Sequence, residues 1–163
     1  MDDEPHPQDT IPKVQTLTEA IAAVVGRTDA DADRLGLIGF SLGATTSMEF
    51  IAANPPGTVK AFADFFGFLK PAIRGGVSGF PPTIILHNKN DQIVSVQNSL
   101  DFDELLLSAG VDHQLVRPYD ERTEIGNHAF RPGGAADLDS RSRVTRWLST
   151  HVSATSEQIE LKL

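Results

Sequence analysis

The stretch Leu35-Gly-Leu-Ile-Gly-Phe-Ser-Leu-Gly43 decides the fold of this chain. Residues 35–40 are apolar or glycine and too few for a helix, which predicts a strand buried on both faces of a parallel sheet. Residues 42–53 then have helical spacing and end at the breaker Asn54-Pro-Pro-Gly57. The stretch therefore predicts a strand that leads directly into a helix, which is the repeating unit of α/β domains.

Helices and strands alternate on both sides of this stretch. The other helices are expected over residues 14–27, 96–109 and 139–151, and the other strands over 59–66, 83–87 and 113–117. Such alternation implies parallel strands joined by right-handed crossovers. We therefore expect an α/β fold with three layers, α/β/α, around a mostly parallel sheet of about four core strands.

The same pattern suggests where the domain begins and ends. One domain is expected over residues 13–152. It is preceded by an acidic, proline-punctuated stretch, 1–12, which is expected to be a flexible tail, because it has neither the basic residues nor the apolar run of a secretory signal. Residues 153–163 are expected to form a C-terminal tail or a short helix.

Composition limits the classes of function. The chain has 163 residues, 40% of them hydrophobic, which suits one domain with its own core. Its net charge of −8 repels phosphate backbones and anionic lipid, so neither a nucleic acid partner nor a membrane partner is expected. The sequence contains no cysteine, which excludes disulfides and cysteine-based zinc sites and fits a cytoplasmic location. No metal and no cofactor are expected.

Ser41 lies at the centre of the pattern G-x-S-x-G, formed by residues 39–43. A serine on a sharp turn between strand and helix is presented above the edge of the sheet, where it can act as a nucleophile. The flanking glycines, Gly39 and Gly43, are expected to remove side chains that would collide there. The following helix points its first N–H groups at a developing oxyanion, so the Leu42 N–H is the predicted oxyanion donor. The alternative is a tightly packed turn without chemistry.

A serine nucleophile needs a base, and His128 is the best placed histidine. Its loop, 120–134, is expected at the same edge of the sheet as Ser41. Asp91, in the turn after strand 83–87, is the predicted acid that orients the imidazole, because the order Ser, Asp, His is the one that such hydrolases use. The alternatives are a surface histidine and an aspartate that caps its own turn. Other candidates for the acid position are Asn90, Asp120, Glu121 and Glu124.

At this point the chain resembles a known family, the dienelactone-hydrolase-like branch of the α/β hydrolases. Four segments carry the resemblance: 31–43 is similar to the nucleophile strand, 61–67 to the next strand, 86–94 to the acid turn and 127–130 to the histidine loop. The resemblance implies a truncated α/β-hydrolase fold and the same three catalytic roles. Dienelactone hydrolases proper have a cysteine nucleophile, so Ser41 implies a serine esterase or a related hydrolase.

The function that follows is hydrolysis of a carboxylic ester or lactone through an acyl-enzyme, with a small-molecule substrate. Phe40, Phe66 and Phe130 are expected to line the substrate pocket. A second interpretation is a non-catalytic or weakly active hydrolase scaffold that serves as a subunit or binding module. A third, a flavodoxin-like domain that binds phosphate at the Ser41 turn, is weaker, because Phe40 and Leu42 stand where such sites have hydroxyl or glycine donors.

The resemblance also bears on assembly. In this family several strands precede the nucleophile strand, and one of their loops supplies a second oxyanion N–H. Only one helix is predicted before Leu35, so strand Leu35–Phe40 is expected at an edge of the sheet. An apolar, uncharged edge is a template for another chain. We therefore expect a homodimer or a separate partner chain at this edge, unless the N-terminal tail covers it.

Overall fold

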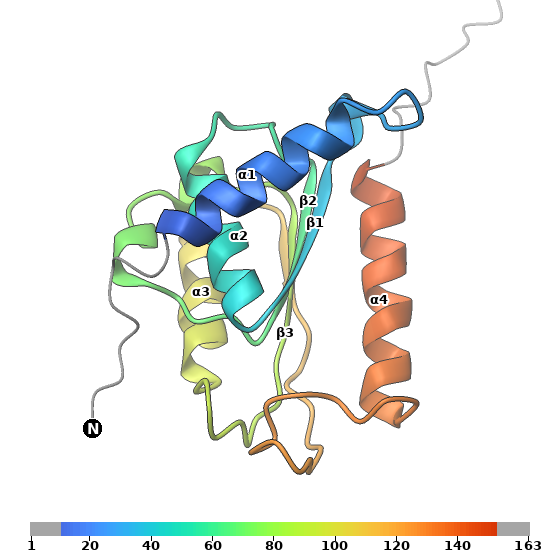
Figure 1. The fold of residues 1–163 in the computed structure, drawn as a ribbon. Helices are drawn as coiled ribbons and strands as arrows, with labels where there is room; N and C mark the ends of the chain where they lie inside the picture. Colours follow the sequence, from blue (N-terminus) through green and yellow to red (C-terminus); the bar gives the residue numbers. More distant parts are fainter. Residues whose placement is uncertain (1–10, 153–163) are drawn as a thin grey trace, which may run out of the picture.

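Four parallel strands form the middle layer of the fold in the computed structural model, which describes residues 11–152 (Figure 1). The strands are β1 (Gly36–Phe40), β2 (Ala61–Phe65), β3 (Thr83–Leu86) and β4 (His113–Leu115), and they pair in the order β1-β2-β3-β4. Each neighbouring pair is parallel. The chain thus adds every new strand on the same side of the sheet, which leaves β1 at one edge and β4 at the other.

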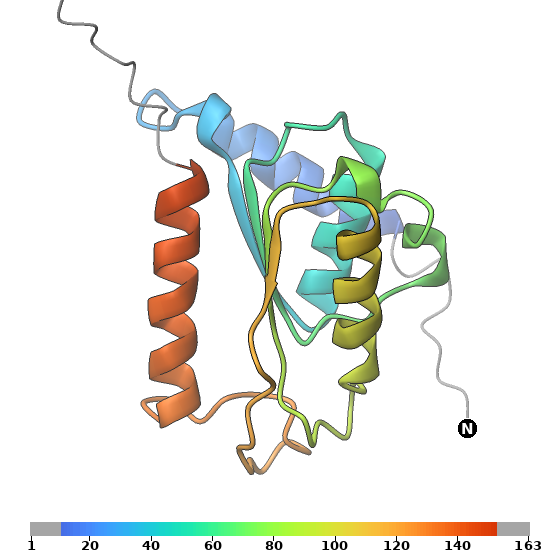
Figure 2. The same cartoon turned by 180° about the vertical axis from the view of Figure 1, so that it is seen from behind.

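Helices cover both faces of this sheet. They are α1 (Ile11–Val25), α2 (Leu42–Ala53), α3 (Gln97–Ser108) and α4 (Ala135–Val152). Figures 1 and 2 show α4 alone on one face, with α1, α2 and α3 on the other. The predicted three-layer α/β/α fold and the order of its elements are therefore confirmed. None of the helices within residues 11–152 has the length and apolar character needed to cross a membrane.

Several element boundaries differ from those expected. Helix α1 begins at Ile11, three residues before the predicted start, so residues 11 and 12 belong to a helix rather than to the tail. Helix α4 begins at Ala135, four residues early, because the Asp137 carboxylate accepts the Gly133 N–H at 2.8 Å and closes the preceding turn. The predicted tails over 1–10 and 153–163 lie outside the described residues.

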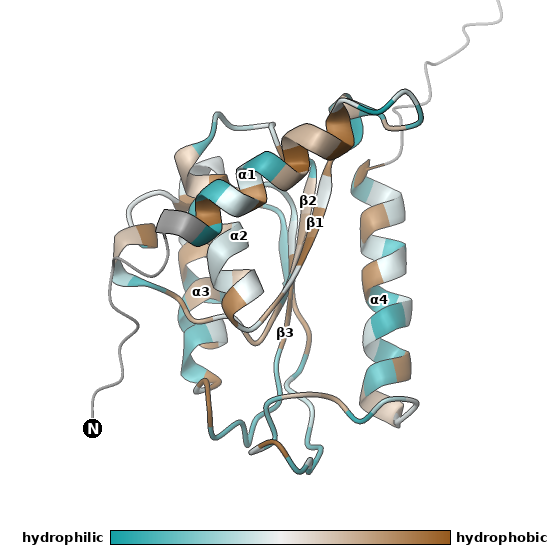
Figure 3. Ribbon diagram, viewed as in Figure 1, coloured by the Kyte–Doolittle hydropathy of each residue, from teal (hydrophilic) through white to brown (hydrophobic). Residues whose placement is uncertain are grey.

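Two apolar layers flank the sheet, because successive side chains of a strand point to opposite faces. Phe62 and Ile85 point toward α2 and α3, where the fully buried Met48 belongs to the same cluster. Ala63 and Ile84 point toward α4 and pack in a second cluster. Helix α4 alternates hydrophobic and hydrophilic residues along its length (Figure 3), as a helix with one buried face does.

Strand β1 is covered differently on its two faces. Leu37 is buried against the helices of the α2 side, whereas Ile38 and Phe40, on the α4 side, are 48% and 55% exposed. Within the described residues, β1 pairs with β2 and with no strand on its other side. The expected position of this strand at a sheet edge is therefore found, and the edge presents apolar side chains.

Candidate active site

Ser41 occupies a strained turn between β1 and α2. Its backbone has φ 52° and ψ −120°, a combination that costs energy for any residue with a side chain. The Ser41 N–H donates to the Phe65 carbonyl at 2.9 Å, and this bond holds the turn. Serine at the start of a helix usually caps the helix with its hydroxyl, but here the side chain makes no such bond. The hydroxyl is therefore left for another partner.

The two glycines beside Ser41 are not equivalent. A Cβ on Gly39 would lie 2.4 Å from the Ala44 Cα, so only glycine lets β1 approach the first turn of α2 this closely. A Cβ on Gly43 would meet nothing within 4 Å. The expectation that both glycines prevent a collision is thus wrong for Gly43, because the helix carries that position away from the strand.

Three loops bring Ser41, His128 and Asp91 together. The His128 Nε2 lies 2.7 Å from the Ser41 Oγ, and the His128 Nδ1 lies 2.7 Å from the Asp91 Oδ2. Since the carboxylate only accepts, the hydrogen of a neutral imidazole sits on Nδ1, and Nε2 is free to accept the serine O–H. The His128 side chain is 12% exposed and that of Asp91 is fully buried. The arrangement can pass a proton from the hydroxyl to the imidazole.

Asp91 also caps its own turn. Its Oδ1 accepts the N–H groups of Ile93 and Val94, at 2.8 and 2.9 Å, while Oδ2 faces His128. The two interpretations of this aspartate are therefore both found in one side chain. The competing acids lie elsewhere: Asp120 is paired with Lys89 at 2.7 Å, and Glu121 accepts the Arg131 N–H at 3.0 Å.

Asn88 joins the acid turn to the histidine loop, a role that the sequence analysis did not anticipate. Its side chain is fully buried, its amide donates to the Glu121 and Asn127 carbonyls, and its Oδ1 accepts the Glu121 N–H at 3.2 Å. Asn127 returns a bond to the Asn90 carbonyl at 3.0 Å and has a positive φ of 61°. These amides fix the backbone immediately before His128. In the sequence, the signal for this role was an uncharged polar residue, Asn88, directly after the buried strand predicted over 83–87.

His87 was also missed. It directly follows β3, and its fully buried ring lies 3.3 Å from the same Asp91 oxygen that faces His128. Its spacing of four residues from Asp91, at the end of a buried strand, was the available signal. Burial lowers the pKa of His87, although the Val94 carbonyl and Asp91 act in the opposite direction. The ring is therefore neutral at physiological pH.

Leu42 is the first residue of α2, directly after Ser41. The first N–H groups of a helix have no partner within the helix and carry its positive dipole end. The position of Leu42 thus leaves a backbone donor beside the serine. Within the described residues, no group of three or more His, Cys, Asp or Glu side chains is arranged to hold a metal ion.

An aromatic cavity adjoins the histidine. It has a volume of about 410 Å³, and its lining includes Phe40, Phe66 and Phe130, the three predicted pocket residues, together with Phe65. The Phe66 ring lies 5.0 Å from the His128 ring, centre to centre. Phe65, which stacks on Phe40 at 4.5 Å, was not predicted. The cavity can hold an apolar group close to the imidazole.

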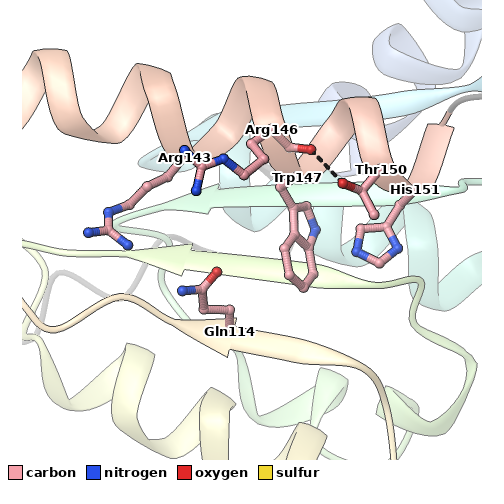
Figure 4. Close-up of a pocket in the computed structure, with 6 residues that line it drawn as sticks. All are labelled: Gln114, Arg143, Arg146, Trp147, Thr150 and His151. Carbon is pink, nitrogen blue, oxygen red and sulfur yellow. Dashed lines mark hydrogen bonds between the residues drawn. The ribbon is translucent and has the colours of Figure 1, made fainter.

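A second cavity lies between β4 and α4, away from these residues. Figure 4 shows Gln114 of β4 facing Arg143, Arg146 and Trp147 of α4. Its volume is about 200 Å³, and its lining contains none of Ser41, Asp91 and His128. Arg143 is already paired with a carboxylate of α4 at 2.7 Å. This cavity is not part of the candidate active site.

Comparison with solved structures supports the fold. The chain resembles dipeptidyl peptidase 4 from Porphyromonas gingivalis, with a TM-score of 0.71 and 19% identity over 85% of this chain and 22% of that one. It resembles a putative dienelactone hydrolase from Klebsiella pneumoniae, with a TM-score of 0.67 and 20% identity over 83% of this chain and 60% of that one. For esterase PE8 the TM-score is 0.63, with 20% identity over 89% of this chain and 67% of that one.

These similarities establish an α/β-hydrolase fold, and the chain spans 22% and 60% of the lengths of the first two proteins. Among curated protein sequences, no relative matches significantly. Residues 5–152 match the sequence profile of the dienelactone hydrolase family, which covers nearly the whole chain, including the strand, turns and loop that carry Ser41, Asp91 and His128. The chain therefore belongs to the dienelactone hydrolase family.

Proposed function

We propose that this protein hydrolyses carboxylic esters or lactones, with Ser41 as nucleophile, His128 as base and Asp91 as the acid that orients it. The observation that carries the proposal is the continuous chain of contacts from the Ser41 Oγ through His128 to the Asp91 Oδ2, each 2.7 Å long. Hydrolase and esterase structures among the similar proteins support the reaction class.

The proposed reaction has two halves. The Ser41 Oγ attacks the carbonyl carbon while its proton moves to the His128 Nε2, and the Leu42 N–H stabilises the oxyanion. The tetrahedral intermediate collapses when His128 returns the proton to the leaving alcohol oxygen, which leaves an acyl-serine. Water then attacks this ester, His128 takes its proton, and the carboxylic acid departs as Ser41 recovers its hydrogen.

We place an apolar part of the substrate in the cavity lined by Phe40, Phe65, Phe66 and Phe130. Aromatic walls bind apolar groups by removing their surface from water, and the Phe66 ring keeps this cavity next to the reacting imidazole. The substrate is a small molecule, and no step of the proposed reaction needs a metal or cofactor. The cysteine-free sequence agrees with a cytoplasmic location.

Labelling with a fluorophosphonate tests the proposal. The parent protein should be labelled at Ser41 and should hydrolyse p-nitrophenyl acetate. Ser41→Ala should lose all labelling and reduce turnover by about 10⁴-fold or to background. Ser78→Ala, which changes an exposed serine far along the chain, is the matched control and should behave as the parent. A folded parent that takes no label would support the non-catalytic alternative, a scaffold that serves as a subunit or binding module.

A further inference from the structure

His87 contacts helix α3 and the turn that carries Asp91. Its Nδ1 lies 2.7 Å from the Ser99 Oγ in α3, and its Nε2 lies 2.9 Å from the Val94 carbonyl and 3.3 Å from the Asp91 Oδ2. Both His87 and Ser99 are fully buried. Burying a polar group costs free energy unless its hydrogen bonds are satisfied. Both ring nitrogens of His87 have a hydrogen-bond partner.

The partners of His87 decide where its hydrogen lies. The Val94 carbonyl and the Asp91 carboxylate only accept, so Nε2 carries the hydrogen. This N–H donates to the Val94 carbonyl at 2.9 Å, and the Asp91 Oδ2 lies 3.3 Å from the same nitrogen as a charge contact. Nδ1 of the neutral ring is then bare and accepts the Ser99 O–H. Ser99 thus satisfies the bare Nδ1 of the tautomer whose Nε2–H lies beside Asp91.

The Asp91 carboxylate consequently takes part in three hydrogen bonds, with Ile93, Val94 and His128, and in one charge contact with His87. Ile93 and Val94 donate to Oδ1, and His87 and His128 approach Oδ2. The carboxylate cannot turn without losing one of these contacts. The donor on the far side of Oδ2 also takes up part of the negative charge that would otherwise act on His128 alone.

We propose that His87, held by Ser99, is a positioning residue for Asp91: its Nε2–H fixes the carboxylate oxygen that orients the base His128. This inference rests on the proposed function, since it concerns the same three groups. His87 is fully buried and is not among the residues that line the cavity of the phenylalanines, although its ring packs against Phe66. Its contact with the proposed triad is the one with the Asp91 Oδ2.

A pH profile separates positioning from simple support of the fold. The titratable groups that face His87 are Asp91 and His128. Ser99 from α3 and the ring of Phe66, which follows β2, complete its surroundings. Without the Nε2–H, more of the charge on Asp91 acts on the imidazolium form of His128. The acidic limb of the kcat/KM profile should therefore move to higher pH.

Two amide substitutions provide a matched test. The amide nitrogen of Gln reaches the position of the histidine Nε2, whereas that of Asn reaches only the position of Nδ1. His87→Asn should lower kcat for p-nitrophenyl acetate by about tenfold with KM unchanged, and should move the acidic limb to higher pH. His87→Gln should restore most of the rate and the parental limb. Equal kcat and equal profiles in His87→Asn and the parent would overturn the inference.

Two further measurements keep the result clear. Fluorophosphonate labelling of the parent at Ser41 is measured first: if the parent is not labelled, the proposed function itself fails, whereas a labelled parent with an unaffected His87→Asn refutes only the role of His87. If thermal melting shows that His87→Asn does not fold, Ser99→Ala decides. Loss of the hydroxyl that holds Nδ1 of His87 should lower kcat without changing KM, and an unchanged kcat would overturn the inference.

Discussion

At the residue scale, Asp64 is a fully buried carboxyl group of β2 in the layer below α2. Its Oδ1 accepts the Gly67 N–H at 2.9 Å, while its Oδ2 is buried without a hydrogen-bond partner within the described part of the chain. Burial raises the pKa of Asp64 to about 7, although the Gly67 N–H acts in the opposite direction. The folded protein thus keeps the proton over a range of pH in which the unfolded chain loses it.

This raised pKa makes stability depend on pH in a definite direction. The contribution of protonated Asp64 is complete below pH 3.8, the ordinary value, and is lost as pH rises through about 7. Asp64→Asn removes this titration. The free energy of unfolding of the variant minus that of the parent should therefore increase by a few kcal/mol between pH 4 and pH 8, because each unit of pKa shift corresponds to about 1.4 kcal/mol. Urea unfolding at pH 4, 6 and 8 measures it.

The exposed Glu104→Gln in α3 serves as the control, because a solvated carboxyl group should show little change in this difference with pH. If Asp64→Asn and the parent differ by the same amount at every pH, the carboxyl group is not held protonated by the fold.

At the scale of elements, the contact between β1 and α2 creates the strained turn at Ser41. A Cβ on Gly39 would lie 2.4 Å from the Cα of Ala44, so strand and helix touch without an intervening side chain. This approach and the bond from the Ser41 N–H to the Phe65 carbonyl of β2 hold the unfavourable φ of 52°. Packing of elements therefore maintains a conformation that the local chain would not adopt by itself.

The two glycines of the turn offer a direct test. Gly39→Ala should lower the free energy of unfolding by more than about 2 kcal/mol, because backbone rather than a movable side chain opposes the new methyl group. Gly43→Ala, inside α2 and open on that side, should stay within about 1 kcal/mol of the parent or be slightly more stable. Thermal or urea unfolding compares them. Equal losses from both substitutions would contradict this account of the turn.

At the scale of the whole molecule, β1 is an edge strand that leaves apolar side chains exposed. Ile38 and Phe40 are about half exposed, and the strand Gly36–Phe40 carries no charge that would discourage pairing. We propose that a second copy of this chain covers the edge. In a two-fold contact, each copy contributes the same apolar, uncharged strand, so the two edges complement each other. The net charge of −8 does not oppose this contact, because no like charges meet at the strand.

Light scattering at micromolar concentration tests this pairing. The parent should have the mass of a dimer, and Ile38→Lys, which puts a charge on the edge strand, should shift it to a monomer. Leu107→Lys is the matched control, since Leu107 is a 68% exposed apolar residue of α3, away from β1, and should leave the dimer intact. A monodisperse parent monomer would exclude the homodimer and leave the alternative of a separate partner chain.

Local patterns were enough to predict most elements. The helix over 42–53 was predicted with its observed bounds, because a glycine-rich turn and a proline breaker delimit it. The start of α4 was missed by four residues, because a side-chain bond from Asp137 and two alanines extend it into a stretch that reads as loop. For the site, the order and context of Ser41, Asp91 and His128 were sufficient to select them, but their contacts were beyond the reach of sequence patterns.

The sequence by itself determined the alternation of strands and helices, the strand-turn-helix around Ser41 and the residues of the candidate triad, since these follow from local periodicity and turn chemistry. Only the tertiary structure decided which glycine of the turn is needed, that Asn88 joins the two loops and that His87 contacts Asp91. For the two glycines and His87, the physical reason is that a local pattern does not show which atoms a folded turn brings into contact. For Asn88 it is distance along the chain. Asn88 and Asn127 are 39 residues apart, and only the packing of β3, α3 and the histidine loop brings such groups within hydrogen-bonding range.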